Sequence, residues 1–208
     1  MSLADRHVTA LMRQITTRND IELVHPFAEL ETIGALVYVA ECYGFRYERV
    51  RLVGKHRIMH VQLVRDPSAW ARQRAAANSA AFPDPGPGRP VPGMYLGSLT
   101  PVPDIQADVE VITALIRYDA LGAAANRKQL LAIGWGSAVL FLLMAVLTGK
   151  YAVLLPLAVL MPLFMLGSLR VNASRRAKLA QRLTAAGCTP VRDASGRERF
   201  VRPVPSTA

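Results

Sequence analysis

The residues of this chain that could do chemistry are histidines, cysteines and carboxylates, and their spacing forms no familiar site. His56 and His60 are four residues apart, a spacing that places two metal ligands on one face of a helix. Both lie in or beside a predicted β-hairpin, where four residues span about 13 Å. One ion could not be shared across that span, so we predict no metal ligand here and expect two ordinary polar side chains.

The carboxylates and thiols are scattered in the same way. Glu29 and Glu31 are two residues apart and therefore do not share a helical face. No P-loop, dinucleotide-binding fingerprint, nucleophile elbow or zinc-protease motif occurs in the sequence. Cys42 and Cys188 are too far apart to form a metal motif, and we expect two free thiols. The sequence predicts no catalytic, cofactor-binding or metal-binding residue and no cofactor. An enzyme remains an alternative. Its site would lie within residues 1–81, and no motif identifies it.

The clearest signal lies in an apolar stretch from Leu130 to Leu169, forty residues with one charge, Lys150. A membrane-spanning helix needs roughly 20 apolar residues to cross about 30 Å of hydrocarbon. The polar residues Thr148–Tyr151 divide the stretch, so it predicts two spanning helices, at about 130–147 and 151–169. The alternative is a pair of buried core helices in a soluble protein.

The charge pattern predicts how this hairpin is oriented. Residues 170–208 carry 9 basic and 2 acidic side chains of a chain whose net charge is +10. Basic residues flank membrane helices on the cytoplasmic side, so we expect both termini in the cytoplasm. Because Arg, Ala, Pro and Gly abound, as in high-GC bacteria, we expect a multi-pass protein of the bacterial cytoplasmic (inner) membrane. The residues expected to determine topology or bind anionic lipid are Arg170, Arg175, Arg176, Lys178 and Arg182.

The expected partners follow from the same residues. Each basic residue near an anionic lipid surface contributes roughly 1 kcal/mol, so the lipid bilayer and its anionic headgroups are expected partners. Nucleic acid would use the same phosphate attraction, but the interleaved aromatic residues of a single-strand binder are missing. Nucleic acid is therefore not an expected partner.

Small residues on the first apolar segment predict close helix packing. Gly134, Gly136 and Ser137 leave a surface on which a second helix backbone can approach. The apolar segments contain no Asp, Glu, His or Arg, the residues that mark proton relays and ion paths. A transporter built from this chain alone is disfavoured, and an oligomeric pore stays an alternative.

The first part of the chain reads as helices and strands of a small α+β domain. The predicted β-hairpin turns at Gly54-Lys55, a pair suited to a two-residue type II′ turn. In that register Val50 faces Met59, and the face opposite Val50 carries Arg49, Arg51 and His60. The predicted elements are helices at 3–17, 27–43 and 69–80 and strands at 21–24, 45–53 and 57–65.

The domain plan predicted from the sequence has five parts: an α+β domain at 1–81, a Pro/Gly-rich linker at 82–103, a membrane-proximal helix at 104–128, a transmembrane hairpin at 129–169, and a basic C-terminal part at 170–208. The last part is expected to hold a helix at 171–186 and a short β-hairpin with strands at 189–192 and 199–202. Gly44 and Gly187 each end a helix and precede a hairpin. This similarity suggests the hypothesis that two related modules pair with each other.

The predicted fold class is thus an integral membrane helical hairpin of two transmembrane helices, with a small cytoplasmic α+β domain and a basic C-terminal helix and short β-hairpin. The function that we expect is a membrane-anchored, non-enzymatic scaffold, adaptor or regulatory subunit of a membrane complex, facing the cytoplasm. It would bind another protein or associate with itself. The alternatives are the membrane-tethered enzyme and the small oligomeric pore or transport component.

Overall fold

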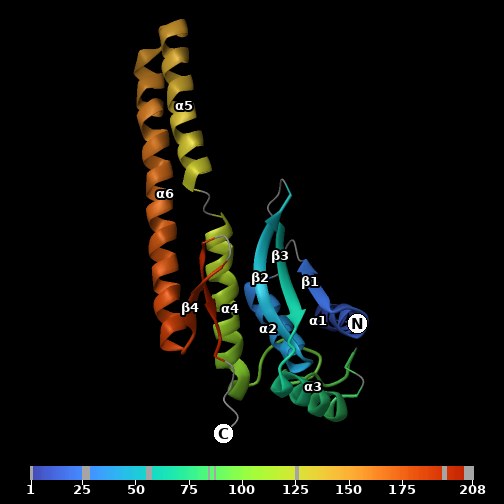
Figure 1. Ribbon diagram of the computed structural model, residues 1–208. Helices are drawn as coiled ribbons and strands as arrows, with labels where there is room; N and C mark the ends of the chain where they lie inside the picture. The colour runs from blue at the N-terminus through green and yellow to red at the C-terminus, as the bar shows by residue number, and fades with distance from the viewer. Residues whose placement is uncertain are drawn as a thin grey trace. The chain divides into compact units, whose positions relative to one another are not determined.

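The computed structural model describes residues 2–24, 29–54, 58–83, 85–86, 88–124, 127–193 and 196–203. Within them the chain forms six helices and two small sheets (Figure 1). The elements are α1 (Leu3–Thr17), β1 (Asp20–Val24), α2 (Leu30–Cys42), β2 (Phe45–Val53), β3 (Ile58–Arg65), α3 (Ala69–Ala81), α4 (Pro103–Ala124), α5 (Arg127–Thr148), α6 (Tyr151–Ala185), β4 (Thr189–Arg192) and β5 (Glu198–Val201).

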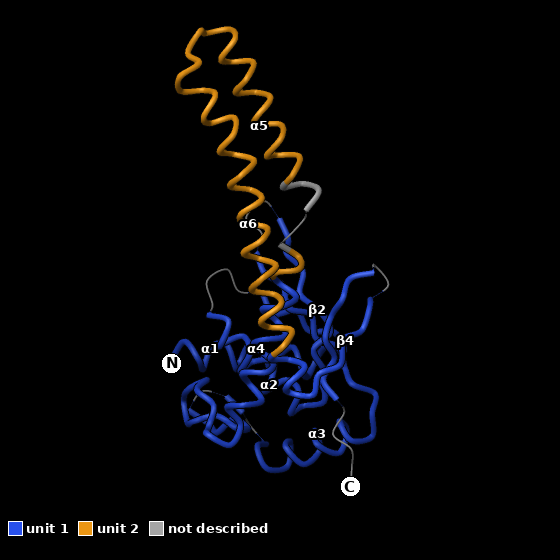
Figure 2. The backbone as a smooth tube through the Cα atoms, turned by 90° about the vertical axis from the view of Figure 1, so that its left-hand side faces the viewer, with its two compact units in different colours: residues 1–120, 182–208 blue, residues 121–181 orange. Residues whose placement is uncertain are grey.

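These residues group into two compact units (Figure 2). Unit 1 comprises residues 1–120 and 182–208, and unit 2 comprises residues 121–181. The five-part domain plan drawn from the sequence stays a prediction. By compactness, however, the first half of the chain and its C-terminal end belong to the same mixed α/β unit.

Local sequence signals account for most element boundaries in unit 1. Ser2 caps α1 through a capping box with Asp5, and the Ser68 hydroxyl accepts a hydrogen bond from the Ala71 N–H at the start of α3. Gly44, at φ 84°, ends α2 in a conformation that favours glycine. The predicted start of α2 at Phe27 lies outside the described residues, which resume at position 29.

The larger sheet is antiparallel, with the order β1-β3-β2. The register of β2 against β3 shifts between Tyr47 and Arg49, so Glu48 is the extra residue of a β-bulge. Side chains of a strand alternate between the two faces of the sheet. The bulge shifts this alternation by one position between Tyr47 and Val50. It brings Val50 and Leu52 to the same face as Tyr47, and Arg49 to the other face.

The register of this hairpin differs from the predicted one. Val50 pairs with Val61 and Leu52 pairs with Met59, so positions 54–57 separate the strands rather than two residues. The two-residue turn is therefore wrong, and Lys55 lies outside the described residues. A shift of two residues keeps every side chain on its own face, and Arg51 indeed lies opposite His60 on the polar face.

Helix α2 forms the centre of unit 1. It is buried around nearly its whole circumference, from Ile33 to Ala40, and it packs against β2 and helices α1 and α3. Gly34 meets α4: a Cβ placed on Gly34 would lie 2.1 Å from the Thr113 hydroxyl oxygen. The sequence alone did not indicate this role for α4.

Part of the Pro/Gly-rich segment also belongs to the core. Val91 and Met94 are buried with the residues of α2, and Met94 forms an isolated β-bridge with Pro101. The sequence predicts a spacer here because seven prolines between positions 82 and 104 prevent a regular element. Proline does not prevent the packing of irregular chain, and the Val91 and Met94 side chains pack this segment against the core.

Unit 2 contains the two longest apolar helices. Residues 131–148 of α5 and the apolar part of α6 are long and apolar enough to cross a membrane, which is weak evidence for association with one. Only 17% and 6% of the residues in these two windows are buried. A core helix of a soluble protein buries most of its apolar side chains, and within this unit these helices do not.

Candidate functional site

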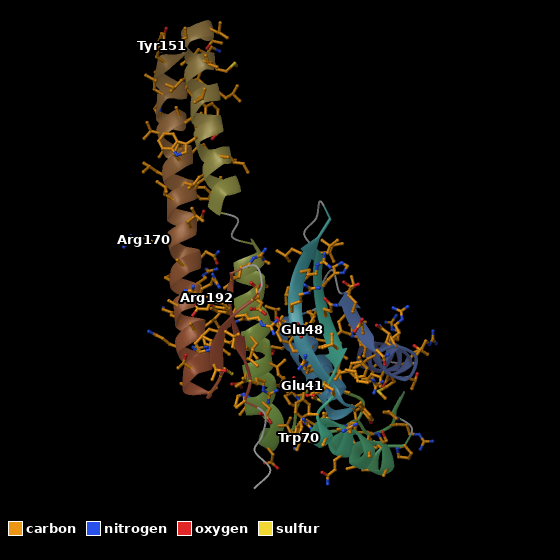
Figure 3. The ribbon with its side chains drawn as sticks, viewed as in Figure 1. Glu41, Glu48, Trp70, Tyr151, Arg170 and Arg192 are labelled. Atoms are coloured by element: carbon orange, nitrogen blue, oxygen red, sulfur yellow. The ribbon has the colours of Figure 1, made fainter. Side chains whose placement is uncertain are left out.

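The C-terminal hairpin, β4 and β5 together with the residues up to position 203, contacts the first half of the chain within unit 1. Arg199 donates a hydrogen bond of 2.9 Å to the Glu48 carbonyl oxygen, across 151 positions of sequence. The Arg199 guanidinium also lies 3.5 Å from the Glu48 carboxylate. Phe200 is buried and meets the Tyr118 ring edge to face, with ring centres 5.1 Å apart. Figure 3 marks the positions of Glu48 and Glu41, two of the acidic residues that this hairpin contacts.

Arg202 makes the shortest of these contacts. It donates a hydrogen bond of 2.7 Å to the Glu41 carboxylate and one of 3.1 Å to Asp108. The Glu41 side chain is 15% exposed, and that of Arg202 is 28% exposed. Burial raises the pKa of Glu41, and the Arg202 charge counteracts this only in part. We call Glu41, Asp108 and Arg202 the Glu41 ion-pair cluster.

Cys42 lies next to Glu41 in sequence and has different neighbours. The Arg74 guanidinium donates a hydrogen bond of 3.1 Å to the Cys42 sulfur and stacks over the rings of Tyr38 and Trp70, at 5.4 and 5.2 Å. The thiol is 2% exposed, and burial raises its pKa. A nucleophilic cysteine needs a lowered pKa and access, so Cys42 has the environment of a structural thiol. Burial likewise raises the pKa of Cys188.

The histidines and carboxylates do not converge. His60 lies on β3 with its Nδ1 atom 2.8 Å from the Glu22 carboxylate on β1, and His56 lies outside the described residues. Among the residues that the structure describes, no three His, Cys, Asp or Glu side chains are close enough to hold a metal ion.

The predicted basic cluster follows the apolar part of α6. Four of its members are exposed, namely Arg170, Arg175, Lys178 and Arg182. Arg176 is half-buried, and its guanidinium lies against Gly122, 3.4 Å from the position that a Cβ would take there. Exposed guanidinium and ammonium groups can meet anionic headgroups without losing a partner inside the protein.

The three predicted packing residues have different environments. A Cβ on Gly134 would lie 3.3 Å from Met165 and 3.6 Å from Pro162, so α6 approaches α5 at this glycine. Gly136 has nothing within 4 Å of its Cβ position. The Ser137 hydroxyl donates a hydrogen bond of 2.9 Å to the Gly134 carbonyl oxygen in its own helix.

The contacts of Glu41 and Arg74 were not found from the sequence. Glu41 and Arg202 are 161 positions apart, and nothing in the local pattern marks one arginine among the 25 basic residues of the chain. The signal that could have helped is weak: Glu41 occupies a polar position in a helix that is otherwise apolar over its last three turns, and such a residue needs a partner.

Comparison with protein-family models, with curated proteins and with solved structures finds no match to this chain.

Proposed function

We propose that this chain is a membrane-anchored scaffold, adaptor or regulatory subunit. The observation that carries this proposal is the exposed apolar surface of α5 and α6. Large side chains such as Trp135, Leu147 and Phe164 are 64%, 81% and 69% exposed. Apolar patches of this extent on a protein mark contact with a membrane or a partner. The two helices form a transmembrane hairpin in the bacterial cytoplasmic membrane, with Lys150 at its outer turn.

The connectivity of unit 1 supports a hairpin with both flanks on one side. Glu41 precedes the apolar helices and Arg202 follows them, and the two side chains form an ion pair inside one folded unit. A bilayer cannot pass between the two halves of such a pair. The chain therefore crosses an even number of times between them, and two helices satisfy this condition.

The charge distribution supports the cytoplasmic side. The basic cluster of α6 directly follows its apolar part, and positive flanks stay in the cytoplasm. The cluster then lies at the headgroup level, where it binds anionic lipid.

A non-enzymatic role is supported by how unit 1 uses its polar side chains. Within its described residues, Glu41, Arg74 and Arg202 hold elements together, and the buried thiols have raised pKa values. The anchored unit would then act by contact, with another protein or with a second copy.

The anchoring is tested by thiol labelling in intact cells and spheroplasts. Both native cysteines are buried, so the unaltered chain gives the background. Lys150→Cys, at the turn, should react with an impermeant maleimide from outside, and Ser174→Cys, on exposed α6, should react only after lysis. Labelling of Ser174→Cys from outside would reverse the orientation, and release of the protein by alkaline carbonate would refute the anchor.

The adaptor role is tested by native mass spectrometry after gentle detergent extraction of the full chain. A stoichiometric second protein, or a homo-oligomer without ion conductance in liposomes, would agree with it. Ion flux through purified protein in liposomes would favour a pore instead.

A further inference from the structure

The three-stranded sheet has one face covered by α2 and one face open, and we infer that the open face binds a second copy of the same chain. Within unit 1, the open-face residues on the outer strands are exposed. They are Asp20, Glu22 and Val24 on β1 and Arg46, Arg49, Arg51 and Val53 on β2. The central strand β3 contributes half-buried residues: Ile58, His60, Gln62 and Val64. This inference does not depend on whether α5 and α6 enter a bilayer.

The charges of the open face are divided between its two edges. The strand register aligns them in rows across the sheet: Asp20–Val64–Arg46, then Glu22–Gln62–Arg49, then Val24–His60–Arg51. Same-face residues on a strand are about 6.8 Å apart, and the three arginines follow one another along β2, with the bulge at Glu48 between Arg46 and Arg49. One edge is acidic, the middle is uncharged or histidine, and the other edge carries three arginines, of which Arg46 lies 3.9 Å from the Glu48 carboxylate of the same strand.

The three arginines share one face because of the bulge at Glu48. Without the extra residue, strict alternation would place Arg49 and Arg51 on the core face with Tyr47. Hydrogen bonds then hold two of the charges in place. The Arg49 Nε donates a hydrogen bond of 2.8 Å to the Gln62 side chain, and Arg49 is exposed. Glu22 contacts His60 through one carboxylate oxygen, with half of its side chain exposed.

A face divided in this way is complementary to itself about one kind of two-fold axis. Two sheets that pack face to face are related by an axis lying in the plane between them. An axis parallel to the strands places β1 of one copy over β2 of the other, so Asp20 meets Arg46 and Glu22 meets Arg49, each twice. An axis perpendicular to the strands places acid over acid and arginine over arginine. The charges therefore select the first arrangement, with β3 facing β3.

Other occupants fit less well. An anionic membrane or a nucleic acid would be attracted by the arginines and repelled by Asp20 and Glu22, which lie two strands away on the same face. Stacking of bases needs exposed aromatic rings, and the described open-face residues include none. A second copy offers both charges in the matching order.

The test uses the full-length protein in detergent with Val64→Cys, which lies on the predicted axis and leaves every charge in place. Facing sheets are about 10 Å apart, so a bismaleimide of about that reach should link two copies. The matched control is Ala77→Cys, on an exposed position of α3. We expect Val64→Cys to cross-link at least about tenfold faster than the control, since Val64 lies opposite itself in this dimer and Ala77 does not.

Charge reversal gives the decisive comparison. In the Val64→Cys chain, Glu22→Arg or Arg49→Glu alone turns two attractive pairs per dimer into repulsive ones, so cross-linking should fall about tenfold. The two changes together restore opposite charges, and cross-linking should recover. Retained protection of the Cys42 thiol shows that each variant is folded.

Equal rates for Val64→Cys and Ala77→Cys would overturn the inference, as would a double variant no faster than the single ones. Loss of binding to phosphatidylglycerol vesicles by Arg49→Glu, with cross-linking unaffected by Glu22→Arg, would assign the face to an anionic surface instead. These readouts are separate from the labelling of Lys150→Cys, so failure here leaves the anchoring proposal standing.

Discussion

Replacing Arg202 with Met should open the C-terminal hairpin. The substitution keeps most of the side-chain volume and leaves the Glu41 carboxylate buried without its cation. Removing one partner of a buried ion pair costs roughly 3–5 kcal/mol. Because Glu41 is 15% exposed and Arg202 is 28% exposed, water screens part of the charge. We therefore expect a loss of about 2–3 kcal/mol.

The assay is the rate at which a thiol reagent labels Cys188, which is 3% exposed and reacts only when the hairpin opens. A loss of 2–3 kcal/mol corresponds to labelling that is roughly 30- to 150-fold faster, measured by peptide mass spectrometry on the full chain. The control is Arg192→Met, since Arg192 is exposed and belongs to the same hairpin, where Figure 3 labels it. That variant should stay within about twofold of the unaltered chain.

The pH dependence separates charge from packing. The pKa of Glu41 in the folded state lies above its ordinary value of 4.5, so folding favours the protonated carboxyl. The contribution of the protonated Glu41 carboxyl to the free energy of unfolding is present in full below pH 4.5. It is lost as the pH rises through the folded-state pKa of Glu41. Without Arg202 that pKa rises further, so the ratio of variant to unaltered labelling should grow as the pH rises from 4.5.

A dipyridyl disulfide reagent, which reacts with thiols in acid, gives the ratio at pH values near 5 and 7.5. An equal ratio at both would refute the electrostatic reasoning, and equal effects of Arg192→Met and Arg202→Met would refute the assignment to the ion pair.

Three further substitutions test the packing and the charges of the described units. Glu41→Gln keeps an acceptor for Arg202 and removes the buried charge. The rate of Cys188 labelling at neutral pH should therefore change by less than about tenfold. A rate increase as large as that of Arg202→Met would contradict this. Gly34→Ala places a Cβ 2.1 Å from the Thr113 hydroxyl oxygen and should destabilise unit 1 by roughly 1–3 kcal/mol, seen as faster Cys42 labelling; adding Thr113→Ala should recover part of the loss. Gly134→Leu should lower the thermal midpoint of the detergent-solubilised protein, because Met165 lies against Gly134, whereas Gly136→Leu, with open space around it, should not.

The elements of this fold were predictable where the signal is local. Helix α1 spans Leu3–Thr17 as predicted, and β2 spans Phe45–Val53 as predicted. Caps, glycine stops and alternating side chains act within a few residues, and the sequence displays them directly. The β-hairpin shows the limit of that information. The residues predicted for each face of the hairpin were correct, because side-chain alternation determines them. The predicted two-residue turn was wrong, because alternation does not determine the turn that sets the register.

What the sequence did not reveal depends on contacts between distant segments. Nothing in the spacing of α4 says that Thr113 will lie against Gly34, and nothing marks Val91 or Met94 as core residues within a proline-rich segment. The ion pair of Glu41 and Arg202 needs the fold before either residue can be identified. Site residues of this kind carry no motif, because their chemistry is an ordinary charge pair whose only special property is its burial.

The packing of unit 2 explains how a chain can bring Arg202 back to Glu41 at modest cost. Closing a flexible loop of about 60 residues costs roughly 3–4 kcal/mol of entropy, which would exceed the gain from one partly exposed ion pair. Residues 121–181 are not a flexible loop, because α5 and α6 return the chain beside its starting point. The Asn172 side-chain amide donates a hydrogen bond of 3.4 Å to the Leu121 carbonyl oxygen, and the Arg176 guanidinium lies against Gly122. Since the helix pair has already closed this part of the chain, the C-terminal hairpin needs only its own contacts, and a change that separates α5 from α6 should loosen the hairpin as well.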